Sequence, residues 1–252
     1  MPPPSGDAPW VVFGNSLVTD LSIWDAQAQA LSGRAGILRY DQAGHGQSGQ
    51  PAGAVDFDQL GGDLLAVMDA AQVDRAVYVG LSMGVPTGLA AHRIAPDRFT
   101  ALVFSDGQAA TAPGGAAGWT DRIRDARSRG MDAFAADTAA RWLTAGAASG
   151  VRERLIRMIA ATPLKGFEAC ATALKDYDYR DQLERIDCPV LLVAGAEDGA
   201  MPASMAEKLR PAIAGARMQV IEGAGHVPCF EQPQAFTAAL TAFLDEIEGA
   251  AR

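Results

Sequence analysis

The sequence predicts an α/β fold in which helices flank a mostly parallel sheet. Three observations support this prediction: the length of 252 residues, a series of short β-rich apolar runs, and longer helical patterns between those runs. Alternating strand and helix patterns are typical of βα units around one parallel sheet. The length fits one large α/β domain or two small ones and excludes a small disulfide-stapled scaffold.

Each predicted strand is short and ends in glycine, a small polar residue or a charged turn. The six strands are expected over residues 10–14, 35–40, 75–80, 99–105, 190–195 and 217–221. Helices are expected between them, over residues 23–31, 57–71, 83–94, 203–213 and 233–247. In the last helix the apolar residues recur at helical spacing, which predicts one buried face: Phe236, Leu240, Phe243 and Leu244.

One segment breaks this alternation. Residues 112–176 show no convincing strand pattern and predict three or four helices, preceded by a flexible glycine-rich stretch at 111–118. We therefore divide the chain into a core, residues 1–111 and 177–252, and an all-helical cap, residues 112–176. A helical insertion between two strands is expected to form a lid over an active site, or simply to add a subdomain to the core.

The net charge disfavours two classes of partner. The chain has 21 Lys plus Arg against 30 Asp plus Glu, a net charge of −9, which disfavours binding to nucleic acid or to a membrane surface. Residues 112–165 hold nine basic and five acidic residues, so the −9 divides into +4 there and −13 elsewhere. Solvated helix faces account for most of these arginines, but a positive cap also favours an anionic small-molecule substrate.

The remaining composition predicts a cytoplasmic protein. The N-terminal residues lack the basic and apolar regions of a signal peptide, and no apolar run reaches the roughly 18 residues that cross a bilayer. Cys170, Cys188 and Cys229 are odd in number and have no C-x-x-C spacing, which favours a reducing compartment over disulfides or zinc. We expect neither a metal nor a cofactor, and the sequence leaves the oligomeric state open.

The motif that carries chemistry is Gly80-Leu81-Ser82-Met83-Gly84. It follows an apolar run and precedes a predicted helix, which is the strand–turn–helix setting of a nucleophile elbow. Side chains two positions either side of the serine would collide with the strand and the helix, and the glycines remove that collision. Ser82 is the predicted nucleophile, and the Met83 N–H at the helix start is a predicted oxyanion donor. A serine that merely caps the helix is the alternative.

A serine nucleophile needs a base, and the chain has three histidines. His226 lies in the loop after the last predicted strand, from which it can reach back over the sheet edge, and it is the predicted base. His45 lies in a glycine-punctuated loop and is expected to organise that loop. His92 is expected at the surface or in the last turn of the helix after Ser82.

An acid must orient the imidazole, and Asp198 is the best-placed carboxylate because it follows a predicted strand. The chain order Ser82, Asp198, His226 is the order expected of an α/β-hydrolase triad. Two other acids are alternatives: Glu197, which is expected to face solvent, and Asp106, which ends the strand after the elbow helix and is the stronger rival.

The second oxyanion donor is expected in the loop after the first strand. We predict the backbone N–H of Leu17 for this role, paired with that of Met83. The side chains of Asn15 and Ser16 are expected to order this loop, and simple turn chemistry is the alternative for both residues.

These motifs resemble the α/β-hydrolase fold, and more narrowly the 3-oxoadipate enol-lactonase family of aromatic catabolism. The general likeness rests on Asp41…Gly44-His45-Gly46…Ser48, the elbow, Gly195…Asp198 and Gly225-His226. The narrower likeness rests on Gly14-Asn15-Ser16-Leu17-Val18, where most relatives have His-Gly, and on cap stretches within 119–142 and 162–170. The similarity extends over nearly the whole chain, from Trp10 to Leu244.

The resemblance implies a cofactor-independent serine hydrolase that opens a small lactone or ester, best represented by a carboxylate-bearing enol-lactone such as 3-oxoadipate enol-lactone. Residues implied to bind the substrate lie on the oxyanion loop and the cap: Asn15, Ser16, Trp119, Arg122, Arg141 and Trp142. A carboxylesterase, a carbon–carbon bond hydrolase with the same triad, and a low-turnover ligand-sensing protein are the alternatives.

Three features depart from the family pattern. Members usually begin with a β-hairpin, whereas nine residues precede Trp10 here, so we expect the hairpin to be absent and the sheet edge to be uncovered or covered by a partner. Ala43 stands where an arginine is common. Val85-Pro86 follows the elbow where a second glycine is preferred, and a proline is tolerated there because early helical N–H groups lack partners.

Overall fold

The computed structural model describes residues 1–4, 8–199 and 201–250, and its centre is a six-stranded sheet. The strand order is β2-β1-β3-β4-β5-β6, and every pairing is parallel. The strands are β1 (Trp10–Gly14), β2 (Gly36–Arg39), β3 (Ala76–Leu81), β4 (Phe99–Ser105), β5 (Val190–Gly195) and β6 (Arg217–Ile221). The predicted α/β class and parallel sheet are confirmed.

The central strands are buried on both faces. Every residue of β3 and β5 is buried, which explains why these strands are continuous apolar runs and do not alternate with polar residues. Four predicted strands agree with the structure residue for residue, and the other two differ by one residue at their ends.

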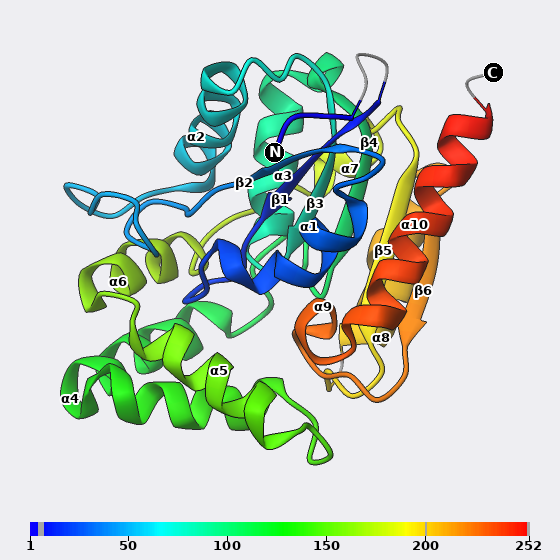
Figure 1. Ribbon diagram of the computed structural model, residues 1–252. Helices are drawn as coiled ribbons and strands as arrows, with labels where there is room; N and C mark the ends of the chain where they lie inside the picture. The colour runs from blue at the N-terminus through cyan, green and yellow to red at the C-terminus, as the bar shows by residue number, and fades with distance from the viewer. Residues whose placement is uncertain (5–7, 200, 251–252) are drawn as a thin grey trace.

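Helices cover both faces of the sheet (Figure 1). On one face α1 (Asp25–Leu31) packs against α10 (Pro233–Ala250), and on the other α2 (Phe57–Ala70) packs against α3 (Gly84–Ile94). Four shorter helices were not predicted, because a single turn carries too little periodicity: η1 (Leu21–Trp24), η2 (Pro96–Arg98), α7 (Arg180–Leu183) and α9 (Pro228–Glu231).

The helix predicted over residues 203–213 is not continuous. The chain instead forms α8 (Met201–Ser204), the π-helical segment η3 (Met205–Leu209) and the 3-10 turn η4 (Arg210–Ala212). Pro211 contributes to this break because it has no N–H to continue the α-helical hydrogen bonds. The apolar spacing therefore located a helical region but not its regularity.

The segment between β4 and β5 contains three long helices that lie together beside one end of the sheet (Figure 1). They are α4 (Gly115–Trp142), α5 (Ser149–Ala160) and α6 (Leu164–Ala173). Gly130 has φ 81° and ψ 163°, so α4 consists of two helical halves joined at a kink. An antiparallel bridge between Ala110 and Asp178 brings the two ends of the segment together. We propose that residues 112–176 act as a cap on the core.

The cap touches the core at loops that follow the strands. A Cβ on Gly166 would lie 1.9 Å from the carbonyl oxygen of Gly44, so these two backbones are in direct contact. The buried Glu231 carboxylate accepts hydrogen bonds from the Thr144 N–H (2.8 Å), the Thr144 hydroxyl (2.6 Å) and the Gly225 N–H (2.8 Å). Glu231 therefore ties the cap to the loop that carries His226.

One edge of the sheet is formed by β2, and no strand precedes β1 in the described part of the chain. The N-terminal amine of Met1 donates to the Ile37 carbonyl, and the Ile37 N–H donates to the Met1 carbonyl, both at 2.8 Å. This edge strand is therefore paired at Ile37. Among the helices that the structure describes, none has the length and apolarity to cross a membrane.

The contacts of Glu231 predict a stability effect. Glu231→Gln replaces one accepting oxygen by an NH₂ group that faces a backbone or hydroxyl donor, so a buried donor loses its partner. We expect the free energy of unfolding to fall by about 2 kcal/mol, measured by urea denaturation. Glu207→Gln, the same change at an exposed residue, should leave stability within about 0.5 kcal/mol of the original. Equal effects from the two variants would contradict this role.

Candidate active site

Ser82 occupies a strained turn between β3 and α3. Its φ is 54°, in the left-handed region that a serine rarely adopts. A Cβ added to Gly80 would lie 2.5 Å from the Gly84 carbonyl oxygen, and one added to Gly84 would lie 2.7 Å from the Gly14 carbonyl oxygen. Both distances are shorter than real Cβ contacts, so the two glycines are required for the close approach that the motif predicts.

Three side chains from three strand ends meet at this turn. The Ser82 hydroxyl lies 2.9 Å from His226 Nε2, and His226 Nδ1 lies 2.8 Å from Asp198 Oδ2. Ser82 follows β3, Asp198 follows β5 and His226 follows β6, so all three lie at the carboxyl edge of the parallel sheet. The structure therefore brings together the three residues that the sequence selected.

The environment of His226 sets its basicity. Burial lowers the pKa of the imidazole, but the charge and hydrogen bond of Asp198, together with the charge of Asp106, outweigh burial and leave the pKa above its ordinary value. Trp142 packs against the ring, with centroids 5.0 Å apart, and its carbonyl oxygen accepts the His226 N–H at 2.7 Å. The cap thus contributes to holding the imidazole in place.

The rival acids occupy other positions. Asp106 is buried, and its two oxygens accept bonds from the Gly195 N–H (2.8 Å) and the Ser105 hydroxyl (2.7 Å). Burial raises the pKa of Asp106 well above its ordinary value, although the charge of His226 opposes this shift. Glu197 is exposed, as expected. Only Asp198, among these three acids, is hydrogen-bonded to His226.

Two backbone N–H groups near Ser82 have no hydrogen-bond acceptor in the described part of the chain. The N–H groups of Leu17 and Met83 have no acceptor among the described residues, although Leu17 is 3% and Met83 1% exposed. Buried N–H groups are almost always paired, so two unpaired ones beside a nucleophile form a candidate oxyanion hole. These are the two donors that the sequence predicted.

A cavity of about 350 Å³ opens in front of the triad. Its walls include Leu17 from the oxyanion loop and all four cap residues that the resemblance implied: Trp119, Arg122, Arg141 and Trp142. Other lining residues were not selected from the sequence, and three polar ones among them lie on the segments that enter and leave the cap: Gln108, Thr111 and Tyr177.

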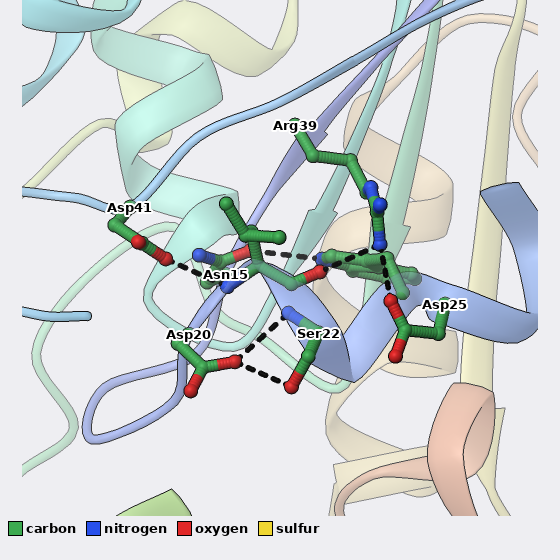
Figure 2. Close-up of polar contacts among 8 residues, drawn as sticks. Asn15, Asp20, Ser22, Asp25, Arg39 and Asp41 are labelled. Atoms are coloured by element: carbon green, nitrogen blue, oxygen red, sulfur yellow. Dashed lines mark hydrogen bonds and ion pairs between the residues drawn. The ribbon is translucent and has the colours of Figure 1, made fainter. Parts of the chain in front are cut away.

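Asn15 and Ser16 do not reach the cavity wall. The Asn15 amide group donates to the Tyr40 carbonyl at 2.8 Å. Its oxygen accepts from Trp24 Nε1 at 3.1 Å (Figure 2), so both polar atoms are used inside the core. The Ser16 hydroxyl is buried, with no hydrogen-bond partner in the described residues. The loop-ordering role expected for Asn15 agrees with these contacts, whereas direct substrate contact by either side chain does not.

Two positive charges of the cap lie in the cavity wall without a carboxylate partner. Several cap arginines are paired with carboxylates, among them Arg127 with Glu168 and Arg129 with Asp137. Arg122 and Arg141, by contrast, form no ion pair with any described carboxylate. Both are exposed residues of the cavity wall.

The two free guanidinium groups affect one another. Arg122 stacks on Trp119, with its guanidinium carbon 4.5 Å from the ring centroid. Partial burial and the neighbouring charge of Arg141 lower the pKa of Arg122. An anion between the two guanidinium groups would relieve their mutual repulsion, so this part of the wall can bind a carboxylate.

The other histidines stay away from the reacting atoms. His45 is buried in its loop. His92 lies in the last turn of α3, as expected, but it is 3% exposed and packs near Phe99, so the alternative of a surface position is wrong. The described residues contain no group of three His, Cys, Asp or Glu side chains arranged to hold a metal ion.

Comparison with known proteins gives the family. Residues 9–233 match the model of the alpha/beta hydrolase fold. The chain is 36% identical to 3-oxoadipate enol-lactonase 2 of Acinetobacter baylyi, over 94% of this chain and 89% of that protein. Among solved structures it is similar to the enol-lactonase from Burkholderia xenovorans LB400 (36% identity, TM-score 0.88, 95% and 92% coverage). It is also similar to a thermophilic esterase from Thermogutta terrifontis (25% identity, TM-score 0.90, 96% and 92% coverage). The chain belongs to the alpha/beta hydrolase fold family, as the sequence resemblance predicted.

Proposed function

We propose that this chain is a serine hydrolase that opens a small lactone or ester through Ser82, His226 and Asp198. The observation that carries the proposal is the unbroken hydrogen-bonded row from the serine hydroxyl to the imidazole (2.9 Å) and on to the carboxylate (2.8 Å). A hydroxyl placed on one imidazole nitrogen, with a carboxylate fixing the other, is the arrangement that activates serine for acyl transfer.

The proposed reaction has two halves. His226 takes the proton of Ser82 as the serine oxygen attacks the carbonyl carbon, and the N–H groups of Leu17 and Met83 stabilise the negative oxygen of the tetrahedral intermediate. His226 then gives that proton to the leaving oxygen. In a lactone the leaving oxygen stays attached to the acyl group, so ring opening leaves one acyl-enzyme. Water activated by His226 then releases the acid and restores Ser82.

The best substrate class is an enol-lactone that bears a carboxylate. Three observations support this choice: a cavity of about 350 Å³ that suits a small molecule, the unpaired Arg122 and Arg141 in its wall, and the similarity to proteins named enol-lactonases. Trp119 and Trp142 supply apolar surface for the ring of such a substrate. A simple carboxylesterase is the second candidate, favoured by the likeness to the thermophilic esterase.

The nucleophile is tested by covalent labelling. A fluorophosphonate probe should label the protein at one site. Ser82→Ala should abolish both labelling and turnover of p-nitrophenyl butyrate, because no other hydroxyl of the described residues is hydrogen-bonded to His226. Ser128→Ala, a change at an exposed cap serine, should label like the original protein. Undiminished labelling of Ser82→Ala would contradict the proposal that Ser82 is the nucleophile.

The acid is tested by comparing the half-buried Asp198 with the buried Asp106. Asp198→Asn should lower kcat by roughly 10³- to 10⁴-fold, because the imidazole loses the partner that fixes its tautomer. Asp106→Asn should lower kcat by less than about tenfold, since the amide can still accept the Gly195 N–H. If Asp106→Asn causes the larger loss, the assignment of Asp198 is wrong.

The raised pKa of His226 predicts the pH profile. The base must be neutral, so kcat/KM should fall as the pH decreases through a pKa that lies above the ordinary imidazole value. Asp198→Asn removes the carboxylate that raises this pKa, so its residual activity should persist to lower pH than that of the original protein. An acidic limb at the same pH in both proteins would show that another group titrates.

The carboxylate subsite is tested with two substrates of equal chain length. Arg122→Gln and Arg141→Gln should each raise KM for p-nitrophenyl hemisuccinate by about fivefold, an effect of the size expected of an exposed ion pair, and leave KM for neutral p-nitrophenyl butyrate unchanged. Arg124→Gln, which alters an arginine paired with Asp121 outside the cavity wall, is the control. Equal KM changes for both substrates would exclude a charge-specific role.

A further inference from the structure

We propose that His45 is a positioning residue that holds the oxyanion donor Leu17 in place through a hydrogen bond to the backbone of Val18. The inference rests on the proposed serine-hydrolase function and adds a residue outside the triad on which the rate should depend. The bond lies between the loop after β1, residues 15–21, and the loop after β2, residues 40–48.

The central contact is a buried bond between a backbone donor and an imidazole acceptor. The Val18 N–H donates to His45 Nε2 at 3.0 Å, and His45 Nδ1 lies 3.0 Å from the Ala43 carbonyl oxygen. A carbonyl can only accept, so Nδ1 carries the proton and Nε2 offers its lone pair to Val18. Val18 is 1% and His45 0% exposed, so water cannot substitute for this bond.

The backbone at Val18 needs support. Its φ is 56°, in the left-handed region, where a β-branched residue is a genuine outlier because its Cβ substituents crowd the backbone. Such conformations persist only where surrounding contacts over-determine them, and they gather at functional sites. Leu17, the predicted oxyanion donor, directly precedes this strained residue.

The peptide units on either side of Leu17 are each held by side-chain hydrogen bonds. The Ser16 carbonyl oxygen, in the same peptide plane as the Leu17 N–H, accepts the Gln42 amide and the Thr19 hydroxyl, both at 2.9 Å. A trans peptide directs its N–H opposite to its carbonyl, so these bonds aim the Leu17 N–H away from the core. The next peptide plane is fixed at its N–H by His45 alone among the described side chains.

The ends of the same loop are also anchored, at residues that flank the strained centre. At one end the Asn15 amide donates to the Tyr40 carbonyl. At the other end the Leu21 N–H donates to the Asp41 carboxylate at 2.7 Å (Figure 2). These anchors fix where the loop begins and ends, and they leave the conformation of residues 17–18 to Gln42 and His45.

The protonation state of His45 suits an acceptor. Burial lowers the pKa of the imidazole to about 4, against the opposing effects of the Ala43 carbonyl and the Asp41 charge. The ring is therefore neutral at working pH. A protonated ring would place a second N–H opposite the Val18 N–H and lose the bond.

A purely space-filling role makes a different prediction from a positioning role. His45→Leu keeps apolar bulk but removes the acceptor, whereas His45→Gln offers a carbonyl oxygen at a similar reach. His92→Leu is a matched control, because His92 is the other deeply buried histidine and its Nε2 has no hydrogen-bond partner in the described residues. A space-filling role predicts that Leu at position 45 is at least as good as Gln.

The kinetic arm uses p-nitrophenyl butyrate. His45→Leu should lower kcat roughly 10- to 100-fold with KM within about threefold, since a displaced oxyanion donor weakens binding of the transition state more than that of the substrate. His45→Gln should recover most of kcat, and His92→Leu should keep it. A folded His45→Leu enzyme with kcat within twofold of the original, or one that Gln fails to rescue, overturns the inference.

A second arm is independent of turnover. Amide hydrogen exchange at residues 17 and 18 should accelerate at least tenfold in His45→Leu and remain unchanged in His92→Leu, and unchanged exchange in both overturns the inference. If the original protein hydrolyses no ester, the proposed function fails while this arm still decides the role of His45. If His45→Leu does not fold, ¹⁵N–¹⁵N coupling across the Val18–His45 hydrogen bond in the original protein decides, and its absence overturns the inference.

Discussion

The close approach of three backbone segments at Ser82 is the constraint on which the rest of the site depends. The turn brings the first residue of α3 against the end of β1, so near that a single Cβ on Gly84 would meet the Gly14 carbonyl. Tyr78 lies beneath this contact and donates its hydroxyl to the Gly84 carbonyl at 2.8 Å. Because β1 continues into the loop that carries Leu17 and β3 ends directly before Ser82, one packing contact sets the relative position of Ser82 and the Leu17 N–H. Bulk at either glycine would separate them.

The cap supplies part of the cavity wall and the positively charged side chains in it. The sheet edge supplies Ser82, Asp198 and His226, but no lysine or arginine of the described core residues lines the cavity. The cap adds Arg122 and Arg141 at the cavity wall, and its Trp142 carbonyl binds the His226 backbone. Glu231, a core residue, binds the cap in return. The net charge of −9 describes the protein as a whole, whereas Arg122 and Arg141 place two positive charges without a carboxylate partner at the cavity wall.

The parts of the site that could be predicted from sequence are those with a local cause. A strand that ends in Gly-x-Ser-x-Gly needs a left-handed serine whatever surrounds it, and parallel strands bring their following loops to one edge, which is why Asp198 and His226 could be selected. The roles of Glu231, Gln108 and Tyr177 have no such local signature, because each depends on where a distant segment packs. The burial of His92 was missed for the same reason, as helical spacing indicates which face points inward but not how deep that face lies.

His45 and His226 have similar hydrogen-bond arrangements but different pKa values. Each is held at Nδ1 by an oxygen acceptor, and each presents Nε2 to a donor. At His226 the acceptor is a carboxylate, whose charge raises the pKa, as suits the proposed role of the imidazole as a base for Ser82. At His45 the acceptor is the neutral Ala43 carbonyl, burial dominates, and the pKa falls to about 4. A ring that cannot take up a proton at working pH is a dependable acceptor, which is what a fixed backbone bond requires. The charge on the atom facing Nδ1 therefore distinguishes the imidazole proposed to move protons from the one proposed to hold a loop.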